Sequence, residues 1–174
     1  LRQLKHLIIS CSLRSGSNSR KMAIELHNQL KNKNVESELM DLRDYDIPIC
    51  DGDKCYDHET TIMLRKKVEE SKCVVISTPV YNFNVSSTAK NFVELTGRMW
   101  EGKIAGFMSA AGGRSGYMSV MSLANSLMLD FRVVIIPKHV HAERSSFEDD
   151  KIEKEIKERI EELAKDVIKF SNAL

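Results

Sequence analysis

Two hydrophobic patterns alternate along the chain and predict its secondary structure. Short, almost continuously apolar runs are typical of strands that are covered on both faces of a sheet. They occupy residues 4–10, 73–78, 103–110 and 131–136, and Pro137 is expected to end the last of them. Residues 35–42 alternate apolar and polar positions more strictly, which predicts an edge strand.

Between these runs, apolar residues recur at the spacing of an amphipathic helix. Helices are predicted over residues 21–31, 60–71, 87–100 and 116–130, with a fifth at the C-terminal end. The last helix has the clearest apolar face, which consists of Ile152, Ile156, Ile160, Leu163 and Val167. Residues 116–130 are apolar almost all round, which exceeds what packing against one sheet requires. We therefore expect a subunit contact there, with Trp100 at its edge.

Five strands that alternate with five helices predict a parallel sheet with helices on both faces. For a chain of 174 residues, the expected form is a doubly wound α/β fold with a five-stranded parallel sheet and strand order 2-1-3-4-5. No linker or repeat divides the sequence, so residues 1–174 are predicted to form a single domain. In such folds a ligand lies beyond the carboxyl ends of the strands, where the strand order reverses.

Composition and charge narrow the class of protein. Apolar residues make up 42% of the chain and charged residues 29%, as in ordinary globular proteins. A formal net charge of +1 gives no long-range attraction to nucleic acid or to an anionic membrane, so neither is expected as a partner. No apolar run reaches the roughly 20 residues that span a bilayer, and no leader pattern opens the chain. We expect a cytoplasmic protein.

The cysteines and histidines predict no metal or redox motif. Cys50 and Cys55 flank the sequence DGDK, a spacing too wide for a CxxC motif, so we expect neither a disulfide nor an iron–sulfur ligand pair there. The other two cysteines lie in or beside apolar runs, where free cysteine acts as a small hydrophobic residue. His139 and His141 follow the fifth strand without a neighbouring cysteine or carboxylate pattern, which favours ordinary surface histidines.

The loop after the first strand has the composition of a phosphate site. It reads SCSLRSGSNSR and places five serines between Ser10 and Ser19, directly before a helix. Backbone N–H groups and the dipole at a helix N-terminus attract anions, and Arg14 can add a bidentate bond. The loop has neither the GxxxxGK[ST] nor the GxGxxG pattern, so the expected ligand is a phosphate monoester. The alternative is a turn in which Ser17, Asn18 or Ser19 merely caps the helix.

The loops after the third and fourth strands have features of a site for a flat heterocycle. The first of them, TPVYNFNVSSTAKN, begins where Pro79 is expected to end the third strand. Its residues 81–84 combine aromatic surface with amide groups, although an ordinary strand-to-helix turn is the alternative. In the second, SAAGGRSGYM, Gly112 and Gly113 allow the backbone to approach a ligand closely. The predicted fold brings all three loops to one edge of the sheet.

In this order and spacing, residues 12–23, 78–91 and 110–116 closely resemble the NAD(P)H-dependent FMN reductase family. The resemblance runs from residue 4 to about residue 136, and the last helix fits by position only. It implies a flavodoxin-like fold that binds flavin mononucleotide (FMN) at the three loops, with the phosphate at the first. The residues that would hold FMN are Ser10, Ser12, Arg14, Ser17, Asn18, Ser19, Pro79, Val80, Tyr81, Asn82, Phe83, Asn84, Gly112, Gly113, Arg114 and Ser115.

Two positions depart from the family pattern. Cys11 stands where the family often has glycine, and Val80 stands where it often has glutamate. The second departure puts in doubt how the edge of the flavin ring or a partner subunit is contacted. The resemblance also implies a homodimer or a dimer of dimers.

The resemblance implies hydride transfer from NAD(P)H to FMN, followed by reduction of free flavin, a quinone, an azo compound or a metal ion. Because the flavin carries the redox chemistry, no catalytic side chain is assigned. Two alternatives stay open. A flavodoxin-type electron carrier is disfavoured by the net charge of +1, because such carriers are usually strongly acidic. A non-enzymatic module that senses flavin or redox state shares the fold, and fold alone does not decide function.

Overall fold

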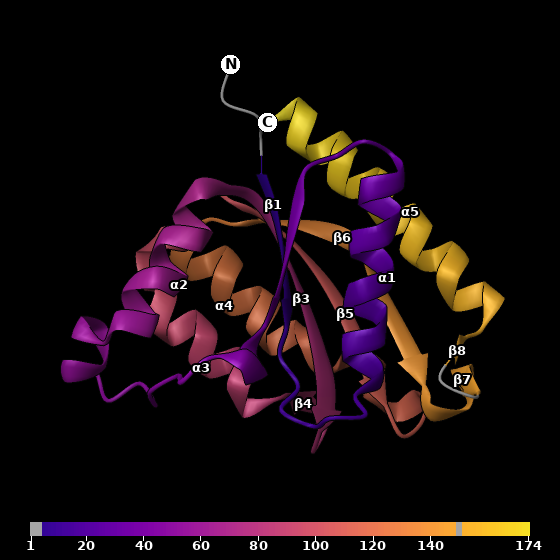
Figure 1. The fold of residues 1–174 in the computed structure, drawn as a ribbon, viewed down its shortest axis with the longest axis horizontal. Coiled ribbons are helices and arrows are strands. Elements are labelled where there is room, and N and C mark those ends of the chain that lie inside the picture. The colour runs from indigo at the N-terminus through magenta and orange to yellow at the C-terminus, as the bar shows by residue number, and fades with distance from the viewer. Residues whose placement is uncertain (1–4, 149–150) are drawn as a thin grey trace.

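The computed structural model describes residues 5–148 and 151–174, so Leu4, where the first predicted strand begins, lies outside the described residues. A six-stranded sheet forms the centre of the molecule, and five of its strands run parallel (Figure 1). In order across the sheet they are β2 (Ser37–Asp41), β1 (Lys5–Ser10), β3 (Ser71–Tyr81), β5 (Ile104–Ala111) and β6 (Val134–Glu143). The predicted order 2-1-3-4-5 is thereby confirmed, and the strand predicted at an edge, β2, lies at one.

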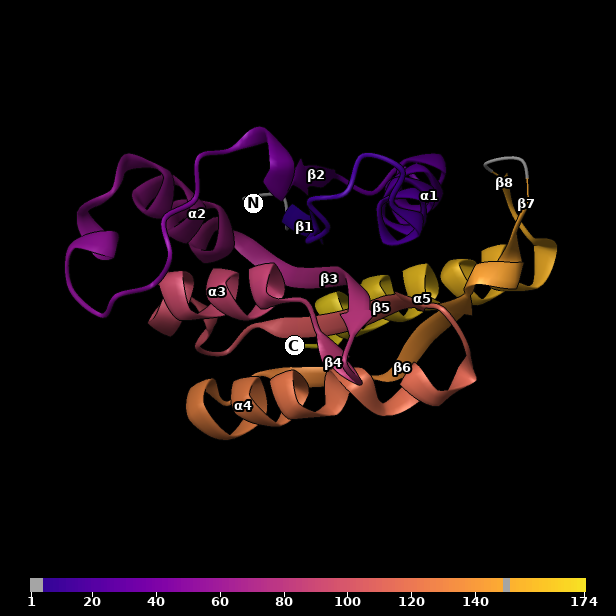
Figure 2. The same cartoon turned by 90° about the horizontal axis from the view of Figure 1, so that it is seen from below.

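Helices cover both faces of this sheet (Figure 2). One face carries α1 (Asn18–Asn32) and α5 (Lys154–Ala173), and the other carries α2 (Glu59–Glu70), α3 (Ser87–Thr96) and α4 (Met121–Phe131). Each face buries its own cluster of apolar side chains, because each helix turns one stripe of such residues toward the sheet. Four of the five residues predicted as the apolar face of the last helix lie buried in α5, whereas Ile152 precedes the helix.

Pro79 lies inside the strand that the sequence predicts it to end. It pairs with Ala110 of β5, and β3 continues to Tyr81. The strand accommodates Pro79 because the proline nitrogen, which carries no hydrogen, faces a side where no hydrogen bond is needed. The carbonyl of Ser77 accepts a hydrogen bond from the backbone N–H of Cys11 at 2.9 Å, on the side of β1. Two residues later, the nitrogen of Pro79 faces the same side, beyond the end of β1, where no ladder hydrogen bond is required.

Pro137 also lies inside its strand rather than at its end. The register of β5 and β6 shifts beside it, so that residues 136–138 of β6 oppose only Gly106 of β5. β6 is an edge strand, and a bulge at an edge accommodates a proline because the extra residues need no partner in the ladder. The strand therefore continues past the proline, and His139 and His141 lie within it rather than after it.

Trp100 lies in the core, which corrects its predicted place at the edge of a subunit contact. Its side chain is fully buried, its Nε1–H donates to Thr96 Oγ1 at 2.7 Å, and its ring meets that of Phe92 edge-on. The helix predicted over residues 87–100 also breaks before this residue. Gly97 has a φ of +45°, a backbone conformation that ends α3, and a 3₁₀ turn follows.

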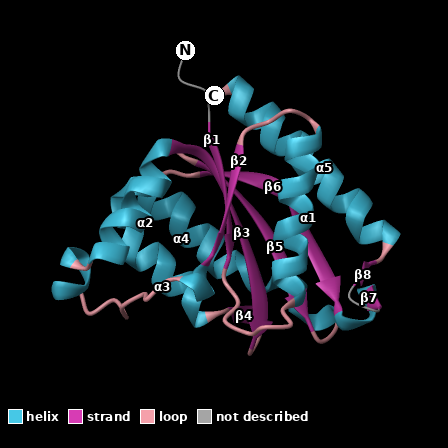
Figure 3. Cartoon of the chain, viewed as in Figure 1, coloured by secondary structure: helices cyan, strands magenta, loops and turns pink. Residues whose placement is uncertain are grey.

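The remaining strands are short and were not predicted (Figure 3). β4 (Asn84–Val85) pairs antiparallel with the end of β3, and β7 (Phe147–Glu148) pairs antiparallel with β8 (Lys151–Ile152) just before α5. A 3₁₀ turn over Arg114–Val120 replaces the first part of the helix predicted over residues 116–130. Among the described ranges, no helix has both the length and the apolar character that crossing a bilayer requires.

Candidate functional site

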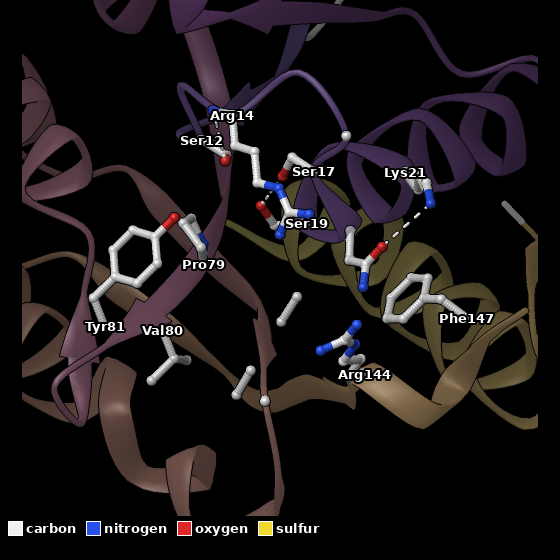
Figure 4. A pocket seen from close by; sticks show the side chains of 15 residues that line it. Ser12, Arg14, Ser17, Ser19, Lys21, Pro79, Val80, Tyr81, Arg144 and Phe147 are labelled. Atoms are coloured by element: carbon white, nitrogen blue, oxygen red, sulfur yellow. Dashed lines mark hydrogen bonds between the residues drawn. The ribbon is translucent and has the colours of Figure 1, made fainter.

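A cavity of about 620 Å³ opens beyond the carboxyl ends of β1, β3 and β5, where the sequence predicts the site (Figure 4). Loops that are far apart in the sequence form its walls. The residues that line it are Ser12, Arg14, Gly16, Ser17, Asn18, Ser19, Lys21, Pro79, Val80, Tyr81, Ala110, Ala111, Gly112, Arg144 and Phe147. Nine of the sixteen residues that were proposed from the sequence to hold FMN therefore line this cavity.

The first loop places more serine hydroxyls at α1 than a helix cap requires. Ser17 is the cap, since its Oγ accepts the backbone N–H of Arg20 at 3.2 Å. Ser19 Oγ lies 2.9 Å from Ser17 Oγ, and Ser12 Oγ accepts the backbone N–H of Arg14 at 3.3 Å. All three serines are buried, yet they line the cavity. The turn is thus both a cap and a wall of hydroxyl groups.

A single residue of β3, Ser77, holds both ends of this loop. Its carbonyl accepts the backbone N–H of Cys11 where the loop begins, and its Oγ donates to the carbonyl of Ser19 at 2.7 Å where the helix begins. Ser77 is fully buried, so these bonds form away from competing water. The neighbouring strand therefore fixes the distance between β1 and the start of α1.

The middle of the loop is tied to β2 through an ion-pair cluster. The Asp41 carboxylate accepts from Nε of Arg20 and from Nε and Nη2 of Arg43, and Arg43 Nη1 donates to the carbonyl of Ser15 at 3.4 Å. Burial alone raises the pKa of Asp41, but the hydrogen bonds from Arg43 and Arg20 outweigh it, so the pKa lies below its ordinary value of 3.8. This carboxylate is therefore ionised at neutral pH.

The cavity has the chemistry of an anion site. Three of its lining residues are basic, Arg14, Lys21 and Arg144, and none of the described residues that line it carries a carboxylate. Arg14 and Arg144 reach toward the same space from opposite sides (Figure 4). Lys21 Nζ donates to Asn18 Oδ1 at 3.2 Å. Together with the N-terminus of α1 and the serine hydroxyls, these groups suit a phosphate monoester.

The structure divides the second predicted loop between two hollows. Asn82 and Phe83, with φ of +50° and +59°, form a two-residue hairpin turn between β3 and β4. This turn carries Asn82 and Asn84 away from the cavity and into a neighbouring hollow of about 550 Å³, where Ser122 Oγ donates to Asn84 Oδ1. Tyr81 lines both hollows, and Phe83 is 70% exposed.

Four other residues proposed from the sequence do not line the cavity. Ser10 is buried in β1, and its hydroxyl has no hydrogen-bond partner among the described residues. Gly113 lies beside the lining residue Gly112 in the third loop. Arg114 points outward to pair with Glu143 at 3.0 Å. The side chain of Ser115 lies outside the described part of the chain.

Sequence reasoning missed the residues that complete the cavity from the other side, notably Lys21, Arg144 and Phe147. Lys21 lies in the first turn of α1, and its spacing from Ser17 places it on the same helix face, which was a usable signal. Arg144 and Phe147 follow β6, and the prediction that Pro137 ends this strand concealed how far it runs. No pattern in the sequence revealed their position.

His141 is buried and His139 is half-buried, and both belong to a hydrogen-bonded network. Ser109 Oγ lies 2.8 Å from Nε2 of His139 and 2.8 Å from Nδ1 of His141. Nε2 of His141 donates to the carbonyl of Gly113 at 3.3 Å, because a carbonyl can only accept. Burial lowers the pKa of His139 to about 4, so this ring is uncharged at neutral pH. The network links β5 and β6 to the third loop.

A parallel sheet of this order, with a basic cavity at the point where β1 and β3 separate, defines the protein as flavodoxin-like, the class that binds FMN at this switch point. Solved structures agree on the fold. The flavoenzyme NAD(P)H:(acceptor) oxidoreductase FerB from Paracoccus denitrificans superposes with a TM-score of 0.81 at 19% identity, covering 98% of each chain. A flavodoxin from the domain Archaea gives 0.67 at 13% identity, covering 97% of this chain and 99% of its own.

The family follows from the sequence match. The pattern of the NADPH-dependent FMN reductase family matches residues 4–146, and the chain belongs to this family. A curated relative, the NAD(P)H-dependent FAD/FMN reductase of Geobacillus thermodenitrificans (strain NG80-2), is 27% identical over 139 residues, which is 77% of this chain and 75% of the relative. The protein is accordingly an oxidoreductase with FMN as its cofactor and NAD(P)H as its co-substrate.

Replacing the carboxylate that ties the loop to β2 tests its structural role. We expect Asp41→Asn to lower the free energy of unfolding at neutral pH by about 1–3 kcal/mol, because two guanidinium groups lose their counter-charge. Since the folded pKa lies below 3.8, this stabilisation is present above pH 3.8 and is lost as the pH falls through the folded pKa. Urea unfolding at a series of pH values measures both effects.

Asp44→Asn is the matched control, since Asp44 is exposed in the turn that follows Asp41. It should leave stability within about 0.5 kcal/mol of the wild type. An Asp41→Asn deficit that stayed constant down to the lowest pH would contradict the assigned ion pairs.

Proposed function

We propose that this protein is a flavin reductase that passes hydride equivalents from NAD(P)H through FMN to a small-molecule acceptor. The observation that carries the proposal is the single cavity that joins a phosphate-type wall at α1 to the loops after β3 and β5. Its volume of about 620 Å³ lies within the usual range of cofactor sites, roughly 300–1,000 Å³. When bound there, FMN supplies the redox chemistry, and the protein supplies binding and orientation.

The proposed phosphate site is the end of the cavity at α1. Ser12, Ser17 and Ser19 offer hydroxyl groups there, and the helix dipole adds positive potential. Arg14 and Arg144 supply charge-assisted hydrogen bonds from two sides. Three basic side chains exceed what an uncharged ligand requires, which supports an anionic ligand over a neutral one.

The proposed site for the rest of the cofactor is the wall formed by β3 and the third loop. Pro79, Val80 and Tyr81 line it on one side, and Ala111 and Gly112 line it on the other. Glycine at position 112 lets the backbone approach a flat ring closely, because no side chain intervenes. Backbone N–H groups in such a position can stabilise negative charge, as an oxyanion hole does.

Among the described residues, the lining contains neither histidine nor carboxylate, which is compatible with hydride transfer because that step needs no general acid or base. The open rim of the cavity suits acceptors of varied shape, and we keep free flavin, quinones, azo compounds and metal ions as the proposed range. We also propose that residues 1–174 form a single FMN-binding domain and that the protein is cytoplasmic.

We further propose that the protein is a homodimer, or a dimer of dimers, through α4 and the 3₁₀ turn before it. Five apolar side chains of this segment are exposed by 43–77%: Tyr117, Met118, Met121, Met128 and Leu129. Four of them, all except Leu129, line a hollow of about 350 Å³ whose other lining residues are mainly apolar. An exposed apolar cluster of this kind is typical of a protein–protein contact.

Arg144 provides a test of the phosphate site. We expect Arg144→Ala to weaken FMN binding tenfold or more, since a hydrogen bond to a charged group contributes about 1.5–3 kcal/mol. Riboflavin lacks the phosphate, so its affinity should change little. Fluorescence titration with both ligands measures the ratio. Arg98→Ala, an exposed arginine in the turn after α3, is the matched control. Equal losses for FMN and riboflavin would contradict the assignment.

The first functional measurement is an anaerobic titration of the FMN-loaded protein with NADPH and then with NADH, followed at the visible flavin band. Rapid bleaching by at least one nucleotide is expected, and the faster donor defines the preference. Bound flavin that neither nucleotide reduces would indicate an electron carrier instead. Failure to bind FMN at all would overturn the proposed cofactor site.

The proposed subunit contact predicts that Met128→Glu yields a monomer, because a buried carboxylate without a partner opposes association. Sedimentation velocity of the wild type and the variant measures the change. Ile62→Glu, at a 57% exposed position on α2, is the control and should leave the dimer intact. A wild type that sediments as a monomer would contradict the proposal directly.

A further inference from the structure

The two cysteines whose spacing in the sequence argues against a motif are brought together by the fold. Cys50 and Cys55 lie in the loop between β2 and α2, which runs past α3 (Figure 1). The Sγ atom of Cys55 lies 3.9 Å from the Sγ atom of Cys50. A disulfide bond is about 2.05 Å long, so small side-chain and backbone adjustments would bring the two sulfurs into bonding distance.

A carboxylate inside the loop causes this approach. Asp51 Oδ1 accepts the backbone N–H of Asp53 at 2.9 Å and that of Cys55 at 3.1 Å, which folds the chain back between the two cysteines. Gly52 has a φ of +76°, which a residue with a side chain would adopt only with strain. The turn therefore brings the two thiols close to each other.

The loop is also fixed to the body of the protein. Asn91 of α3 accepts the backbone N–H of Cys50 at 2.8 Å and donates to the carbonyl of Pro48 at 2.9 Å. The hydroxyl of Tyr56 lies 3.6 Å from Cys50 Sγ, and the guanidinium group of Arg65 lies over the Tyr56 ring. Because these contacts restrain the loop, the short distance between the sulfurs belongs to the folded state.

The other two thiols differ from Cys50 in their burial. Cys11 and Cys73 are fully buried on opposite faces of the sheet. Burial raises the pKa of both, to about 12 for Cys73, so neither is a thiolate at neutral pH. Cys50, by contrast, is only half-buried, whereas Cys55 is buried. The pair thus has one accessible sulfur and one shielded sulfur.

We propose that Cys50 and Cys55 form a redox-modification site, at which hydrogen peroxide converts the dithiol into a reversible intramolecular disulfide. The site is separate from the cofactor cavity, whose lining includes neither residue, and it does not depend on the proposed function. A metal ion suits the pair less well. Structural zinc takes four ligands, whereas the described residues offer no cluster of three or more candidate ligands.

The reaction proceeds in two balanced steps. The Cys50 thiolate attacks one peroxide oxygen, an S–O bond forms as the O–O bond breaks, and the departing hydroxide takes up a proton to become water. The Cys55 sulfur then attacks the Cys50 sulfur, an S–S bond forms as the S–O bond breaks, and a second water leaves. The two thiols lose two electrons and two protons in total, and the peroxide is reduced to two waters.

Lys54 lies between the two cysteines, which makes the product easy to recognise. The folded, reduced protein is treated with hydrogen peroxide, alkylated in denaturant and digested with trypsin. We expect the peptides on either side of Lys54 to stay joined through a disulfide, and dithiothreitol to separate them. The number of titratable thiols should fall from the four in the sequence to the two of Cys11 and Cys73.

Variants identify the order of the steps. In Cys55→Ser, the joined peptides should be absent and a sulfenic acid at Cys50 should react with dimedone. Cys73→Ser is the control and should form the joined peptides as the wild type does. Recovery of Cys50 and Cys55 as separately alkylated peptides after peroxide treatment would overturn the proposal. A disulfide from Cys50 to another copy of the chain, in place of the internal one, would overturn it as well.

Discussion

The candidate site exists because two neighbouring parallel strands send their connections to opposite faces of the sheet. From β1 the chain enters α1 on one face, and from β3 it passes through β4 to α3 on the other. The two loops diverge from adjacent strand ends and leave a space between them, which their side chains line. The cavity, its basic lining and its hydroxyl wall all depend on this divergence.

The serine-rich loop that forms one wall of the cavity is held in place by polar contacts from neighbouring strands. Ser77 of β3 binds the first loop at both ends, and Asp41 of β2 reaches its middle through Arg43. Ser77 and Asp41 are buried, where an unsatisfied polar group costs more free energy than in water. The loop is therefore preorganised before any ligand arrives, which reduces the entropy lost on binding.

β2, whose Asp41 holds the serine-rich loop after β1, also leads into the loop that carries Cys50 and Cys55. β2 ends at Asp41, and the chain then leaves the sheet edge and is fixed again at α3 through Asn91. Beyond this second anchor the chain forms a tight turn of its own around Asp51. Polar contacts thus fix both the serine-rich loop after β1 and the segment that precedes the turn with the two cysteines.

The sequence by itself determined the strand order, the two-faced arrangement of helices and the location of the site at the carboxyl edge. Hydrophobic periodicity reports which side chains are buried, and for a parallel α/β chain the order of strands and helices leaves few topologies. The sequence also identified the serine-rich loop, because cap residues and helix starts are local signals. These features follow from local signals and from the order of those signals along the chain.

Only the tertiary structure decided what lies across the cavity and where the prolines fall. Pro79 and Pro137 stay within their strands because their nitrogens face an open side or a bulge, and a proline in a sequence does not reveal what lies beside it. Arg144 reaches the cavity through the strand extension that follows Pro137, and Cys50 meets Cys55 through a turn that Asp51 closes. Each of these positions depends on contacts that neither the composition of the sequence nor the spacing of its residues reveals.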